Sequence, residues 1–169
     1  VTSAVNNSLL PGKINFQITR LNVMFLVTTK PVSIDSPDFS TLQEIKLIYQ
    51  GSCHCQAITF EVEAPQDIKA DYCNCSICSK SGFLHLIVPL SKFKLLTGEE
   101  SLSTYSFNTG VAKHTFCKTC GIKPFYTPRS NPDGIDINVN CLDTRPKSVN
   151  ITEFDGQNWE QHAHKVAYK

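Results

Sequence analysis

The chain has 169 residues, of which 41% are hydrophobic, and its 16 basic side chains nearly balance 15 acidic ones. A formal net charge of +1 excludes the strong bias that is typical of general nucleic-acid and membrane-surface binders. The most apolar N-terminal run, residues 21–27, is interrupted by Asn22 and is far shorter than the ~20 residues of a membrane span. We therefore predict one domain of ordinary size, with no nucleic-acid partner and no membrane partner.

Residues 1–43 are predicted to be a poorly ordered N-terminal extension. They are rich in Ser, Thr and Asn and are interrupted by prolines, and only residues 14–18 and 23–28 have strand character. A transit peptide is the alternative, because no acidic residue precedes Asp35, although the stretch carries few positive charges. The extension does not bear on the functional interpretation.

The folded unit is predicted to span residues 44–169 and to begin with a β-hairpin. Residues 45–49 have the composition of a strand, and residues 57–62 alternate apolar and polar side chains, as a half-buried strand does. The connection between them contains Cys53 and Cys55. We therefore expect a hairpin whose turn is clamped by a metal ion.

The rest of the folded unit contains many short apolar or alternating runs that are separated by Gly and Pro turns. Apolar periodicity of the helical kind is nearly absent from them. Pro124 would place its own strand at the edge of a sheet. These features predict an all-β or mainly β fold. The expected strands cover residues 83–89, 91–96, 103–107, 122–126 and 135–140.

Cysteine spacing is the strongest signal in the sequence, because seven of the eight cysteines fall into three tight clusters. Zinc takes four soft ligands in a tetrahedron, and a Cys-x-Cys or Cys-x-x-Cys pair supplies half of such a site. Two such pairs make a closed structural site, whereas three thiolates leave one position open, as a catalytic zinc requires. We predict two zinc ions, one held by Cys53, Cys55, Cys117 and Cys120, and a second by Cys73, Cys75 and Cys78.

Other uses of these cysteines fit the sequence less well, and one alternative stays open. A disulfide framework is disfavoured because neighbouring cysteines pair poorly, and a thioredoxin-type motif would need a βαβ context. The central cluster also has an alternative as a second closed site, with His54, His85 or His114 as the fourth ligand. The isolated Cys141 is predicted to be a buried core residue. Metal-binding cysteines indicate a reducing, intracellular compartment, with the cytoplasm favoured and the nucleus as the alternative.

The ordered cysteine motifs resemble those of the glutathione-dependent formaldehyde-activating enzyme family, whose domain is similar to that of centromere protein V. The resemblance covers roughly residues 44–160 and leaves the N-terminal extension outside it. Members of the family often have glycine after the first Cys-x-Cys pair, where this chain has Gln56. If that position needs a positive φ, the substitution costs about 1 kcal/mol. The motifs that carry the resemblance are residues 51–55, 73–78 and 114–121, with further blocks at 105–109, 125–132 and 141–143.

The resemblance implies a mainly β, Mss4-like fold with two zinc ions and the partition of cysteines given above. It implies a carbon–sulfur lyase-type activity in which formaldehyde and glutathione join as S-(hydroxymethyl)glutathione. Lys80, Lys113, Lys123 and Arg129 are candidates to bind the carboxylates of glutathione, and the three histidines are candidate proton carriers. The alternative, suggested by centromere protein V, is a non-catalytic zinc module that presents a β surface to a protein partner.

Overall fold

The computed structural model describes residues 45–166. The predicted extension, residues 1–43, lies outside the described residues. The predicted hairpin is present: β1 (Lys46–Ser52) and β2 (Thr59–Pro65) are antiparallel, and Ser52 faces Thr59 across the turn. β5 (Phe93–Thr97) pairs with the other edge of β2 and completes a three-stranded sheet of order β1-β2-β5.

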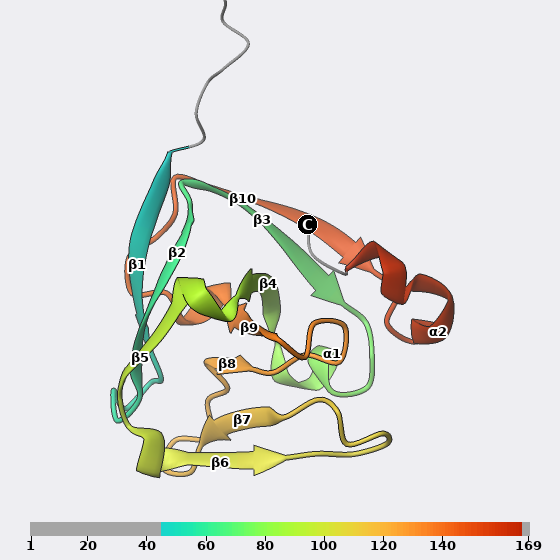
Figure 1. The fold of residues 1–169 in the computed structure, drawn as a ribbon, viewed down its shortest axis with the longest axis horizontal. Coiled ribbons are helices and arrows are strands. Elements are labelled where there is room, and N and C mark those ends of the chain that lie inside the picture. The colour runs from blue at the N-terminus through green and yellow to red at the C-terminus, as the bar shows by residue number, and fades with distance from the viewer. Residues whose placement is uncertain (1–44, 167–169) are drawn as a thin grey trace, which may run out of the picture. The chain divides into compact units, whose positions relative to one another are not determined.

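A second sheet has five strands in the order β10-β3-β4-β9-β8. Figure 1 shows β10 and β3 running side by side, and these two strands are parallel, whereas the remaining pairs are antiparallel. β8 lies at the edge of this sheet, as the proline before it predicts. The strands are β3 (Asp67–Cys73), β4 (Leu84–Pro89), β8 (Phe125–Tyr126), β9 (Gly134–Asn138) and β10 (Ser148–Phe154).

The remaining elements are short. β6 (Leu102–Tyr105) and β7 (His114–Cys117) form a two-stranded antiparallel sheet. α1 (Cys78–Ser81) and α2 (Trp159–His162) are single helical turns, and none of the helices between residues 45 and 166 is long and apolar enough to cross a membrane. The fold is therefore mainly β, as the sequence predicts. Single 3₁₀ turns cover Leu90–Lys92, Glu99–Ser101, Val139–Cys141 and Ala163–Lys165.

Apolar side chains from the two larger sheets form the main core. Phe60 from β2 packs against Phe93 and Phe125, with ring centroids 5.8 and 5.5 Å away. Cys53 and Cys117 belong to this core, whereas Cys73 and Cys78 belong to a second apolar cluster with Phe154 and Val166. The two groups of cysteines therefore sit in two different apolar environments.

The two faces of the β4–β9 pair lie in different environments. On one face, Leu86 pairs with Ile137 and lies in the main core. On the other face, His85 pairs with Asn138, and Ile87 pairs with Asp136. Alternation of apolar and polar residues usually indicates that the polar ones face solvent. In β9, however, every residue is buried, including the polar ones. They face an internal polar site instead.

Candidate active site

Four cysteines from two distant turns come together. The sulfur atoms of Cys53, Cys55, Cys117 and Cys120 all lie within 4.8 Å of one another. Cys53 and Cys55 follow β1 in the hairpin turn. Cys117 is the last residue of β7, and Cys120 lies in the turn after it. This arrangement could hold a metal ion with four soft ligands.

Backbone hydrogen bonds shape both turns of this group. The Gln56 amide donates to the carbonyl of Cys53, and the Gly121 amide donates to the carbonyl of Cys117. The hydrogen bond from the Cys120 amide contributes most to lowering the pKa of the Cys117 thiol, to about 6. Burial raises the pKa of Cys53 to about 12. Backbone hydrogen bonding thus favours the thiolate form of Cys117 within this group.

Gln56 occupies a left-handed backbone conformation, with φ of 61°. A positive φ at this position means that a residue other than glycine lowers the stability of the turn. Residues other than Gly, Asn and Asp rarely adopt this region, and the penalty is about 1–2 kcal/mol. The first cysteine turn is therefore strained in this chain but keeps its geometry.

The central cluster forms a second, smaller group. Cys73 is the last residue of β3, Cys78 is the first residue of α1, and their sulfur atoms lie within 4.8 Å of each other and of the Cys75 sulfur. Hydrogen bonds from Cys73 and Cys78 hold the pKa of Cys75 well below its usual range. Hydrogen bonding with Cys73 and Cys75 raises the pKa of Cys78. Three thiol groups sharing protons in this way favour a thiolate at Cys75.

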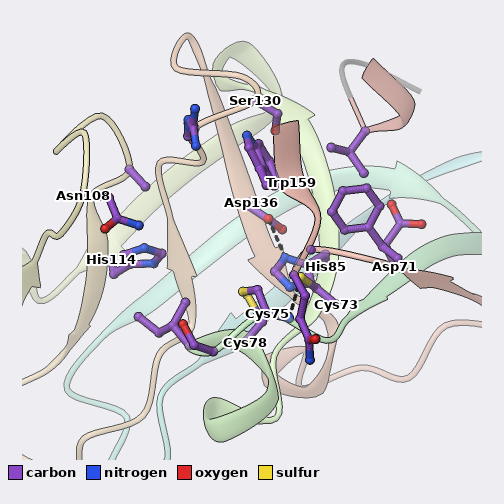
Figure 2. Close-up of a pocket in the computed structure, with 18 of the residues that line it drawn as sticks. Asp71, Cys73, Cys75, Cys78, His85, Asn108, His114, Ser130, Asp136 and Trp159 are labelled. Atoms are coloured by element: carbon purple, nitrogen blue, oxygen red, sulfur yellow. Dashed lines mark hydrogen bonds and ion pairs between the residues drawn. The ribbon is translucent and has the colours of Figure 1, made fainter. Parts of the chain in front are cut away.

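This three-cysteine group opens onto a cavity of about 680 Å³. Figure 2 shows Cys73, Cys75 and Cys78 in this cavity, together with Asp71, His85, Asn108, His114, Ser130, Asp136 and Trp159. The volume falls in the range of small-molecule sites, about 300–1,000 Å³. The cavity wall is partly apolar and partly formed by residues that can ionise.

The C-terminal segment forms one wall of this cavity and is attached directly to the central cluster. Asn74 Nδ2 donates to Asp155 Oδ1 at 3.1 Å, and Asn74 Oδ1 accepts from the Gln157 amide at 3.0 Å. Trp159, from α2, lines the cavity and packs edge-on against Phe154. Residues that are 81 and 83 positions apart in the sequence therefore build one site.

A histidine–aspartate pair lies in the same wall. His85 Nδ1 is 2.7 Å from Asp136 Oδ2, and both side chains are almost fully buried. Within the described part of the chain, His85 Nε2 and Asp136 Oδ1 are buried and lack a hydrogen-bond partner. Buried polar atoms are rarely left unpaired, so a water, an ion or a ligand is expected beside these two atoms.

A second histidine lines the cavity from β7. His114 stacks on Tyr126 with ring centroids 4.8 Å apart, and its Nδ1 atom is 2.8 Å from Lys123 Nζ. Burial, together with the charge of Lys123, lowers the pKa of His114 to about 4. The Lys123 ammonium group is itself buried and lies 4.0 Å from the centre of the Tyr126 ring.

The structure sorts the candidate residues from the sequence. His85 and His114 line the cavity, but neither belongs to the group of three sulfur atoms, and His54 is exposed. Among the four candidate cations, Arg129 lines the cavity; Lys80, Lys113 and Lys123 are not among its lining residues. The prediction that Cys141 is buried was wrong, because this side chain is only partly buried at the edge of the core.

The sequence interpretation missed several residues of the site. Asp136 has a weak signal, a carboxylate between two isoleucines in an apolar strand, and buried carboxylates require partners. Asn74 lies between two of the clustered cysteines, but nothing in the sequence indicates its partners near residue 155. Gly156 lies against the central cluster, and only the three-dimensional structure shows this.

Comparison with known proteins gives consistent results. The family model described as glutathione-dependent formaldehyde-activating enzyme matches residues 48–159. A Halomonas elongata protein, named provisionally as a glutathione-dependent formaldehyde-activating enzyme, is 29% identical over 82 residues, which are 44% of this chain and 52% of that protein. The match thus spans about half the length of that relative. A Rhodobacter sphaeroides protein of known crystal structure is 38% identical, with a TM-score of 0.54, over 61% of this chain and 99% of that one.

Proposed function

Because the chain belongs to the glutathione-dependent formaldehyde-activating enzyme family, we propose that it is a zinc-dependent, carbon–sulfur lyase-type protein. Its reaction would join formaldehyde and glutathione into S-(hydroxymethyl)glutathione. The observation that carries this proposal is the group of three cysteines at the wall of a cavity of about 680 Å³. The folded, zinc-binding domain would begin near residue 44.

The donor atoms of both groups suit zinc. Four clustered thiols match a closed structural site, so Cys53, Cys55, Cys117 and Cys120 would hold one ion. Cys73, Cys75 and Cys78 would hold a second ion and leave room for an external ligand from the cavity. When bound, this second zinc would favour the thiolate form of a coordinating thiol, which is the reactive form.

Arg129 is the cation best placed to bind a carboxylate of glutathione. It lines the cavity, and its Nη2 atom is 2.7 Å from Glu160 Oε1, which lies at the same wall. A guanidinium group can bind a carboxylate through two hydrogen bonds. A carboxylate of the tripeptide would therefore exchange with Glu160 on Arg129, and Glu160 would move into solvent.

The apolar part of the wall would limit the access of water to the reacting atoms. Ile87, Phe154 and Trp159 line the cavity around the three cysteines. Reduced access of water strengthens the hydrogen bonds and charges inside a site. As the chemistry requires reduced thiols, we place the protein in an intracellular, reducing compartment, with the cytoplasm favoured over the nucleus.

A second candidate function is a non-catalytic zinc module that binds a protein, like the domain of centromere protein V. The observation in its favour is the exposure of apolar residues on two strands at the edges of sheets. Ile48 on β1 is 71% exposed, and Ile151 on β10 is 60% exposed. Such edges are common sites of strand addition by a partner.

The substitution Cys75→Ser separates the two functions. Exchange spectroscopy by NMR would measure how fast glutathione and formaldehyde interconvert with their adduct, with and without the protein. The enzyme account expects acceleration by the wild type, loss of it in Cys75→Ser, and an unchanged fold by circular dichroism. A wild type that gives no acceleration over the spontaneous reaction would favour the binding module.

A further inference from the structure

The hydrogen bond to Asp136 fixes which nitrogen of His85 can accept a hydrogen bond. A carboxylate only accepts, so His85 Nδ1 carries the hydrogen in the 2.7 Å contact. The neutral imidazole then has its lone pair on Nε2. This is the buried atom without a partner in the described residues, and His85 lines the cavity. The fold therefore leaves a buried hydrogen-bond acceptor unused on a residue that lines the cavity.

His114 has the opposite arrangement. An ammonium group only donates, so Lys123 Nζ donates to His114 Nδ1 at 2.8 Å. Burial lowers the pKa of Lys123, and the contact of its ammonium group with the Tyr126 ring favours the charged form. A neutral imidazole that accepts at Nδ1 carries its hydrogen on Nε2. The low pKa of His114 agrees with a neutral ring near pH 7.

The two histidines share one wall of the cavity. Both contact Tyr126, His114 by stacking at 4.8 Å between ring centroids and His85 edge-on at 6.1 Å. Both rings line the same cavity as the three central cysteines. In Figure 2 the labelled rings come from different strands, β4 and β7.

We propose that this pair sets the orientation of the two reactants: His85 Nε2 accepts a hydrogen bond from the thiol, and His114 Nε2–H donates one to the aldehyde oxygen. This inference rests on the proposed function and adds two catalytic residues to it. In the addition, the S–H bond and the π bond of C=O break, and an S–C bond and an O–H bond form. The electron pair of the π bond moves to oxygen beside His114, and the thiol proton leaves toward His85 and ends on the product hydroxyl.

The first test measures the histidine tautomers directly, without any assay of activity. Long-range ¹⁵N–¹H correlation spectra of the zinc-loaded protein distinguish Nδ1–H from Nε2–H, and His85→Phe and His114→Phe assign the signals. We expect Nδ1–H for His85 and Nε2–H for His114. Addition of glutathione, with free zinc present so that both groups of cysteines stay filled, should shift the His85 Nε2 resonance. The opposite tautomer at either residue, or an unchanged His85 signal with saturating glutathione, would overturn the inference.

The second test uses matched substitutions and the exchange rate of glutathione with formaldehyde. His85→Phe and His114→Phe keep a flat ring but remove the hydrogen bond, and each should slow exchange by about tenfold or more, the effect of one such bond. His114→Gln restores a donor and should recover part of the rate. His164→Phe is the control, because His164 is exposed and does not line the cavity.

The outcomes separate this inference from the proposed function. If the wild type accelerates exchange and both Phe variants keep its rate with full zinc content, the histidine pair is wrong and the function stands. If the wild type gives no acceleration, the function is wrong. The tautomers of His85 and His114, and the response of the His85 signal to glutathione, are then the only test of the histidine pair. The same two observations are the test when a Phe variant does not fold.

Discussion

A Cβ atom added to Gly156 would lie 2.4 Å from the sulfur of Cys73, and 3.0 Å from Cβ of Cys75. Real Cβ atoms do not approach other atoms this closely, so only glycine fits between the C-terminal segment and the central cysteines. The segment that carries Trp159 is therefore built directly onto the candidate catalytic group. This contact gives a specific way to disturb one group of cysteines and leave the other intact.

We predict that Gly156→Ala weakens metal binding at the three-cysteine group and spares the four-cysteine group. The added methyl group must move Cys73 or the segment, because no space is available. Zinc content measured by mass spectrometry of the metal should fall from two toward one per chain. Gly110→Ala is the control for backbone strain without a steric clash, since φ there is 68° but a Cβ meets no atom within 4 Å. Equal zinc content in both variants would contradict the prediction.

The strained turn at Gln56 predicts a stabilising substitution. Gln56→Gly removes the cost of a left-handed conformation at φ of 61°, about 1–2 kcal/mol, but gives the unfolded chain more freedom, about 0.5–1 kcal/mol. Urea denaturation of the zinc-loaded protein should show a net gain of roughly 0.5 kcal/mol. The same substitution at Gln50, in the middle of β1, should lower the free energy of unfolding. A loss of stability with Gln56→Gly would show that the turn is not strained.

Burial of neutral His114 predicts a dependence of stability on pH. Its pKa is about 4 in the folded protein, below the usual value of 6.5, so the unfolded state binds the extra proton first. The stabilising contribution is complete above pH 6.5 and is lost as the pH falls toward 4. The free energy of unfolding, measured across this range, should decrease less steeply for His114→Phe than for the wild type. Parallel curves for the two proteins would contradict this assignment.

Much of the site was predictable because local spacing brings ligands together without long-range information. The hairpin that carries Cys53 and Cys55 was predicted and is present, and the partition into four and three cysteines matches the two groups that could hold a metal. Short strands between Gly and Pro turns were enough to predict a mainly β fold. The family match later supported the resemblance that these motifs indicated.

The missed features depend on pairings between distant segments. Residues 67–73 and 148–154 contain several polar residues and do not have a strong strand signal, yet they form a parallel pair, β3 with β10. The contact of His85 with Asp136 exists only because β4 and β9 are neighbours in one register. A single sequence does not specify such a register, so the cavity wall could not be derived from it.

We propose that the chain holds two zinc ions in different ways, one closed by four cysteines and one open to an external thiol. Zinc per chain should be measured on protein purified without chelator, before and after dialysis against glutathione, with S-methylglutathione as the control that lacks a thiol. The account predicts two ions, of which glutathione removes one and the control removes none. Two ions that both resist glutathione, or a value near one from the start, would contradict it.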